Sequence, residues 1–186
     1  MSRALLSVVA LMLATGVALA QAPAPAVEPG TKLNFGQSVG GATLSRSATT
    51  AGGSTYGYVA PNGMDITVDV YGGGRRVPNG SSHPTIVNQF TDELSVISQQ
   101  AGTAGLRGFE RPSVPSACTY GQYTFRCIVF SAAGSSVTGR IHGKFLLIGY
   151  REHFVKIIIH WNQVGGQTVA DADKVLNAFV PALLTR

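Results

Sequence analysis

Residues 139–163 alternate apolar and polar side chains with the two-residue period of β-strands, interrupted by the polar triplet Arg151-Glu152-His153. This pattern predicts two strands joined by a turn at the triplet. We expect the hairpin to be the centre of a sheet around which the rest of the chain is built.

The length of that turn decides which side chains share a face. A three-residue turn places His160 opposite Lys144 and leaves one wholly apolar face around Trp161. A two-residue turn would instead bury His142 and Lys144 beside Trp161, which is costly without partners. We therefore favour three residues, and the second face then carries a basic surface formed by Arg140, His142, Lys144, Lys156 and His160.

Two helices are predicted from apolar residues at helical spacing. The first covers residues 84–101, after a proline suited to the first helical position, with the stripe Ile86, Phe90, Leu94 and Ile97. The second begins at Thr168, where Asp171 completes a capping box, and Pro181 should kink or end it near Val180. Its stripe is Val175, Leu176, Phe179, Val180 and Leu183.

A further hairpin is predicted at Asn62-Gly63, the dipeptide most typical of a two-residue turn. That loop length pairs Val59 with Ile66, and the buried row is Met64, Ile66, Val68 and Val70. Residues 102–116 are expected to form a long loop. Together these elements predict an α+β domain over residues 32–186, with an antiparallel sheet of about six strands in βββαβββα order and two helices packed on it.

The first 20 residues have the pattern of a signal peptide: Arg3, then an apolar run, then Ala18-Leu19-Ala20 before the expected cleavage. An uncleaved anchor is the alternative, although the apolar run is short for a membrane span. Residues 21–31 are rich in alanine and proline and are expected to form a flexible leader. The mature protein is therefore expected to be periplasmic or secreted, with no membrane span after cleavage.

Cys118 and Cys127 are the two cysteines of the chain. Gly121-Gln122 lies between them, and a turn centred between Gln122 and Tyr123 would place the two cysteines directly opposite each other. In an oxidising compartment this predicts a disulfide. A pair of free thiols for metal or redox chemistry is the alternative, but their spacing is not that of a CxxC motif.

Positive charge is concentrated in the second half of the chain. Residues 111–168 hold six basic residues against one acid, although the whole chain has 14 basic and 9 acidic residues. Such a region favours anionic partners. For an exported protein we expect an anionic envelope polymer or a protein partner, and no nucleic acid. The alternative is a basic chain with no specific partner.

The order of elements, the aromatic-rich strand from Val155 to Trp161 and the helix from Asp171 to Phe179 resemble the PsbP/Mog1-like α+β domains. The resemblance covers residues 33–184. Members of that group are mostly binding or assembly proteins rather than hydrolases, and the resemblance implies such a role here. It transfers no ligand-binding or catalytic residue.

No motif in the sequence indicates an enzyme or a cofactor. A serine hydrolase needs an aligned nucleophile, base and orienting acid, and the chain has no GxSxG. His142, His153 and His160 lack the carboxylates that would complete a metal site, so no metal is expected. We therefore expect a non-enzymatic exported binding or assembly protein that uses the basic surface; the alternative is an envelope-acting hydrolase with a site under the loop at residues 102–116.

Overall fold

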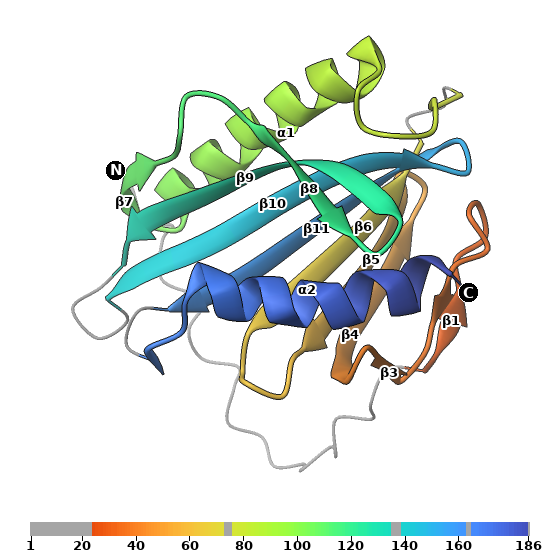
Figure 1. The fold of residues 1–186 in the computed structure, drawn as a ribbon, viewed down its shortest axis with the longest axis horizontal. Helices are drawn as coiled ribbons and strands as arrows, with labels where there is room; N and C mark the ends of the chain where they lie inside the picture. The colour runs from red at the N-terminus through yellow and green to blue at the C-terminus, as the bar shows by residue number, and fades with distance from the viewer. Residues whose placement is uncertain (1–23, 73–75, 135–138, 163–164, 186) are drawn as a thin grey trace, which may run out of the picture.

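The computed structural model describes residues 24–72, 76–134, 139–162 and 165–185. Six strands precede helix α1 (Pro84–Thr103), and five more precede helix α2 (Val169–Leu184). Figure 1 shows how these elements are arranged. The strands are β1 (Ala26–Val27), β2 (Asn34–Phe35), β3 (Ser38–Val39), β4 (Ala42–Thr50), β5 (Gly53–Val59), β6 (Asp65–Tyr71), β7 (Arg107–Glu110), β8 (Ser116–Tyr120), β9 (Tyr123–Ala133), β10 (Arg140–Tyr150) and β11 (His153–Asn162).

The main sheet has nine strands in the order β3-β4-β5-β6-β11-β10-β9-β7, with β8 also paired to β9, and each pairing is antiparallel. The α+β prediction with an antiparallel sheet and two helices is confirmed. The predicted six strands in βββαβββα order were wrong. The short strands β1 and β3 were missed, and the expected loop at residues 102–116 forms β7 and leads into β8.

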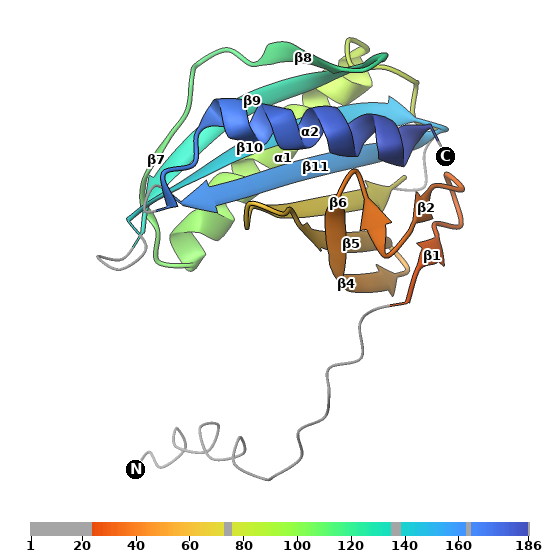
Figure 2. The same ribbon diagram turned by 60° about the horizontal axis from the view of Figure 1, so that its bottom comes forward.

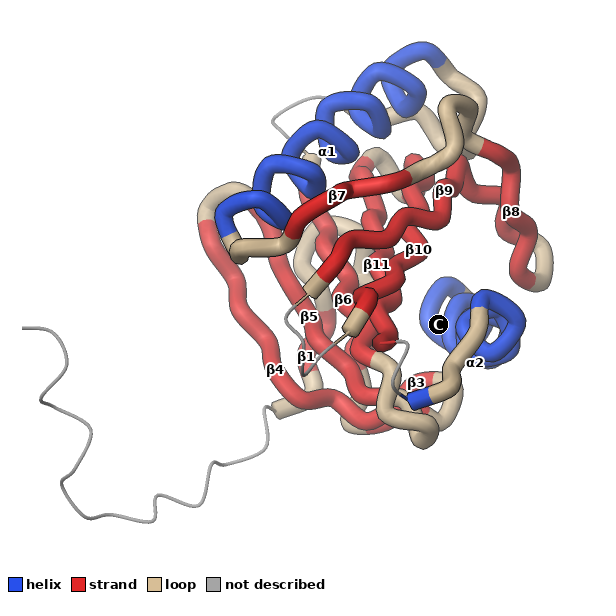
Figure 3. Tube along the Cα trace, turned by 90° about the vertical axis from the view of Figure 1, so that its left-hand side faces the viewer, coloured by secondary structure: helices blue, strands red, loops and turns tan. Residues whose placement is uncertain are grey.

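The sheet lies between the two helices, so the molecule has three layers (Figure 3). The larger core packs α2 against one face, and a smaller core packs α1 against the other. The predicted α1 stripe is buried in full. In α2, Leu176, Phe179, Val180 and Leu183 are buried, whereas Val175 is partly buried. Helical periodicity therefore identified the correct inward face of both helices.

Helix α2 begins as predicted. Thr168 is its N-cap and forms a reciprocal capping box with Asp171. Pro181 was expected to kink or end the helix near Val180; the helix continues past it to Leu184, so the second of these outcomes was wrong. Its C-terminus is held by two tyrosines, because the hydroxyl groups of Tyr123 and Tyr150 both donate hydrogen bonds to the backbone oxygen of Leu184.

The hairpin between β5 and β6 has a longer loop than predicted. Ala60 donates a backbone hydrogen bond to Met64, and Gly63 lies at φ 82°, a left-handed conformation that suits glycine. The loop thus holds three residues rather than two, and Tyr58 pairs with Ile66 instead of Thr67. The predicted buried row from Met64 to Val70 is nevertheless confirmed.

The hairpin between β10 and β11 has a shorter turn than predicted. Tyr150 pairs with His153, so the turn contains two residues, Arg151 and Glu152, both with positive φ. The three-residue turn was therefore wrong. Lys144 now lies opposite Ile159 rather than His160, and it is buried on the α2 face.

Other expectations concern the N-terminus. The expected signal peptide, residues 1–20, lies outside the described residues. The leader expected at residues 21–31 was predicted too long, because β1 pairs with β2 from Ala26 onward and the side chains of Glu28 and Thr31 are buried. Among the described residues, no helix has the length and apolar character needed to cross a bilayer.

Candidate functional site

The two-residue turn divides the five residues of the predicted basic surface between two faces of the sheet. Arg140, His142 and Lys144 lie on the α2 face with Trp161, whereas Lys156 and His160 lie on the α1 face. The single basic surface expected from the sequence is therefore not formed. That any of these residues binds a ligand stays a prediction.

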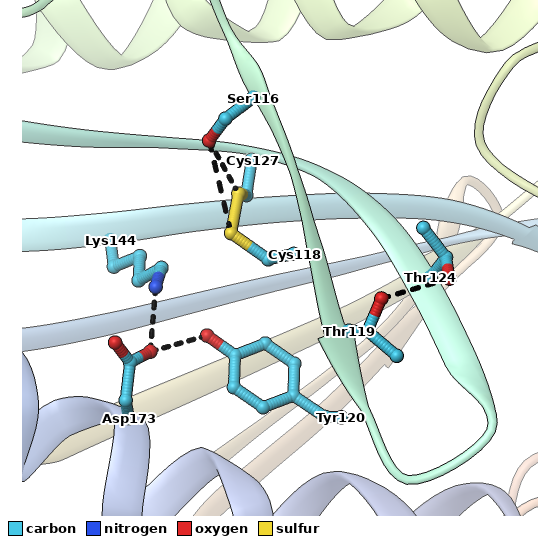
Figure 4. Close-up of a disulfide and its surroundings, with 8 residues drawn as sticks. All are labelled: Ser116, Cys118, Thr119, Tyr120, Thr124, Cys127, Lys144 and Asp173. Carbon is cyan, nitrogen blue, oxygen red and sulfur yellow. Dashed lines mark hydrogen bonds and ion pairs between the residues drawn. A yellow bond between two sulfur atoms is a disulfide. The ribbon is translucent and has the colours of Figure 1, made fainter.

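On the α2 face, Lys144 belongs to a cluster that we call the closed cluster: Lys144, Asp173 and Tyr120 (Figure 4). The Nζ of Lys144 and the hydroxyl of Tyr120 both lie 2.6 Å from Oδ1 of Asp173. The lysine side chain is only 8% exposed, and it also lies over the Tyr120 ring. Burial, together with the neighbouring Asp173, raises the pKa of Tyr120. Lys144 thus has the partner whose absence made its burial look too costly.

The predicted disulfide between Cys118 and Cys127 is confirmed and lies beside the closed cluster (Figure 4). The predicted register of the two strands was wrong, because the turn is centred one residue earlier than expected, between Gly121 and Gln122. Tyr120 pairs with Tyr123 across the turn, so Cys118 lies opposite Phe125 and not opposite Cys127. The two cysteines are diagonal neighbours on one face, with Cα atoms 5.9 Å apart, which is within disulfide reach.

The other two residues of the predicted basic surface that lie on the α2 face also have partners. The guanidinium of Arg140 lies 2.7 Å from the Glu110 carboxylate. The ring of His142 stacks on Trp161 with centroids 5.7 Å apart. The α2 face therefore presents basic side chains that already have partners.

On the α1 face, Lys156 belongs to a second cluster, which we call the open cluster: Lys156, Asp69, Glu93 and Tyr71. Its Nζ lies 2.8 Å from Asp69 Oδ2 and 3.0 Å from Glu93 Oε2. Asp69 is the cross-strand neighbour of Lys156, and Glu93 reaches the sheet from α1. The Tyr71 hydroxyl donates to Glu93 Oε1 at 2.8 Å. Four side chains from two strands and a helix thus converge at one point.

Neighbouring polar groups fix the two carboxylates of the open cluster. Thr55 donates to Asp69 Oδ1 at 2.6 Å, and Gln89 donates to Glu93 Oε1 at 3.1 Å. Burial alone would lower the pKa of Lys156, but the two carboxylates outweigh it and hold that pKa above its ordinary value. Lys156 is therefore a protonated ammonium at neutral pH and is not a nucleophile.

The open cluster lies at the floor of a hollow of about 270 Å³. This hollow adjoins a second, of about 530 Å³, with which it shares residues of the β4–β5 turn and Tyr71. Besides the cluster, the first hollow is lined by Ala48, Thr50, Gly52, Gly53, Ser54, Thr55 and Val70. The second extends to Glu28, Gly30 and His153. Neither is lined by residues of the closed cluster.

His160 lies farther along the same face and is uncharged at neutral pH. Burial lowers its pKa, against the opposing effect of Asp65. Its ring meets the Phe130 ring edge-on, with centroids 5.8 Å apart. His160 therefore adds aromatic surface rather than charge.

The geometry needed for hydrolysis is not found in the described part of the chain. No serine, threonine or cysteine side chain donates to a histidine there, and no three histidine, cysteine, aspartate or glutamate side chains gather as a metal site would need. The segment at residues 102–116 lines neither hollow. The site proposed there from the sequence has no counterpart among these contacts.

Sequence reasoning missed the open cluster. From the sequence, no role was assigned to Asp69 or Glu93. Both roles depend on β6 lying next to β11, which no local pattern reveals. The one available signal was Gln89 and Glu93, four residues apart on the flank of a predicted helix.

Comparison with models of known protein families finds no match to this chain, and a search of curated proteins finds no significant match either.

Proposed function

We propose that the chain is an exported, non-enzymatic binding protein and that its ligand occupies the hollow above the open cluster. The observation that carries the proposal is the convergence of Asp69, Glu93, Lys156 and Tyr71 at the floor of a surface hollow. Concave sites with a few fixed polar groups are the usual places for ligands. A polar network needed only to hold α1 on the sheet does not require such an opening.

The charges at the hollow favour a ligand that donates hydrogen bonds. Two carboxylates surround one ammonium, so the open cluster carries a net negative charge. A carboxylate has about four acceptor positions, and Thr55 and Lys156 together use two of those of Asp69. Hydroxyl or amino groups of a ligand fit the unused positions. The anionic polymer expected from the sequence loses its support here, because the lysine is already paired.

Export is proposed from two features. The first 20 residues have the signal-peptide pattern, and the disulfide is of the kind that persists in oxidising compartments. A periplasmic or secreted location places the hollow in contact with envelope polymers and envelope proteins. A neutral envelope polymer or an envelope protein with exposed donor groups is therefore the partner we favour.

The test is retention of the mature protein on an immobilised envelope fraction. Asp69→Asn removes one of the two negative charges at the floor of the hollow and so cancels the net charge of the open cluster, and we expect retention to fall at least tenfold. Asp65→Asn is the matched control, because Asp65 lies on the same strand and face but lines neither hollow. Equal retention of the two variants would refute the hollow as the binding site.

A further inference from the structure

The outer edge of β4 is open over most of its length. β3 pairs only with Ala42 and Thr43, and the backbone N–H of Leu44 donates one more hydrogen bond to the carbonyl oxygen of Gln37. A bulge lies at Ser45. From there to Thr50 the strand is exposed, and on the side facing away from β5 it pairs with no other described strand. Figure 2 shows β4 at the margin of the sheet. We infer that a second copy of this chain pairs with this edge.

The edge has little protection against such pairing. Free strand edges are normally guarded by lysine, proline or an inward charge, and residues 45–50 have the sequence SRSATT. The single charge, Arg46, does not point outward along the edge, because its guanidinium donates to Thr67 across the sheet at 2.8 Å. The bulge guards only the start of the open segment.

Symmetry selects a second copy as the partner. Two identical antiparallel edges are self-complementary about a twofold axis perpendicular to the sheet. Residues that face each other across an antiparallel pair point to the same side of the sheet, whereas neighbours along one strand point to opposite sides. The twofold axis must therefore pass between one residue and the same residue of the second copy. Centring on Ser47 would bring the two Arg46 side chains to diagonal positions. Centring on Ala48 places each Arg46 opposite Thr50 of the partner subunit, with the two arginines about 13 Å apart, beyond the screening length at physiological salt.

The pairing would also complete the proposed site, a consequence that rests on the proposed function. The perpendicular axis keeps the α1 faces of both copies on the same side. Strands β4, β5 and β6 of each copy then form one continuous floor between two α1 helices. Because Ala48 and Thr50 already line the first hollow, the partner strand lies along its rim. A polymeric ligand could then contact two equivalent hollows at once, which raises its apparent affinity.

The association should be weak and dependent on concentration. It relies on backbone hydrogen bonds and small side chains, and buries little apolar surface, so the interface belongs to the small, transient class. Sedimentation and light scattering of the mature protein over a hundredfold concentration range should show a mass rising from one towards two chains. Ala48→Lys places two ammonium groups opposite each other and should abolish the rise.

A charge-swap pair makes the test specific. Ala48→Lys and Ala48→Glu should each stay monomeric alone, and an equimolar mixture should associate at least tenfold more tightly than either. Val114→Lys, at an exposed position far from β4 in sequence, controls for added charge and should dimerise like the unmodified chain. Circular dichroism reports whether each variant is folded. A chain that stays monomeric throughout, or a mixture that associates no better than its components, overturns the inference without bearing on retention by the envelope fraction.

Discussion

The two faces of the sheet carry clusters that share three kinds of group but have different surroundings, and the open cluster has Asp69 as a second carboxylate. Each has a lysine from the central hairpin, a carboxylate from a helix and a tyrosine hydroxyl bonded to that carboxylate. The closed cluster lies between α2 and the disulfide-linked β8–β9 hairpin (Figure 4). The open cluster instead borders a hollow. Similar groups thus hold a helix in place on one face and, in the function we propose, bind a ligand on the other.

Coverage by neighbouring elements explains the difference. The tip of the β8–β9 hairpin reaches α2, where Gly121 approaches Pro181 and Tyr120 contacts Asp173. On the other face, α1 packs against β9, β10 and β11 but leaves β4, β5 and most of β6 uncovered. The uncovered strands carry threonine, aspartate and glycine where the covered ones carry isoleucine and phenylalanine. The function we propose follows from this gap in the layer.

The largest expected effect is in the closed cluster. Asp173→Ala leaves Lys144 buried and unpaired, and we expect the free energy of unfolding to fall by about 3 kcal/mol. The midpoint and slope of a urea titration measure it. Adding Lys144→Met should restore most of the loss, because a buried pair can often be replaced by apolar side chains at little cost. If Asp173→Ala alone and Asp173→Ala with Lys144→Met are equally unstable, Asp173 does not stabilise the fold by pairing with Lys144.

The disulfide is expected to contribute slightly less. Replacing both cysteines by alanine opens a short loop with a sequence separation of nine, for which chain entropy gives about 2.5 kcal/mol. Because the bond anchors only the hairpin over α2, ligand retention at the open cluster should be unchanged. A loss of retention in a variant that is still folded would break the separation between the two faces.

The sequence was sufficient for the features set by periodicity and by local chemistry. The inward faces of α1 and α2 and the capping box at Thr168 followed from spacing alone. The disulfide followed from the hairpin signal between the cysteines and the expected oxidising compartment, although the register was wrong. The turn between β10 and β11 did not, because its energetics depend on whether Lys144 finds a carboxylate. That carboxylate lies 29 residues later, on a helix whose position no local pattern specifies.

The open cluster was beyond sequence reasoning for a similar reason. Lys156 was grouped with Lys144 as free positive charge, although Glu93 is 63 residues away in sequence and 3.0 Å away in the fold. Counting basic residues therefore overestimated the charge available to a partner. The pairing of β6 with β11, which places Asp69 beside Lys156, is decided by the whole sheet.

The smallest expected effect concerns alkaline pH and compares the two tyrosines directly. Burial, reinforced by the adjacent carboxylate, raises the pKa of both Tyr71 and Tyr120 above the ordinary value near 10. A raised pKa in the folded state contributes stability that is complete below the unfolded pKa and declines as pH rises above it. Raising the pH from 10 to 11 should therefore lower the free energy of unfolding by about 1 kcal/mol for each of the two tyrosines. Urea titrations at the two pH values measure this loss. In Tyr71→Phe and in Tyr120→Phe, the loss between pH 10 and 11 should be smaller by about 1 kcal/mol than in the unmodified chain. If only Tyr120→Phe does so, the open cluster is more hydrated than its contacts indicate, and the two faces differ more than the structure suggests.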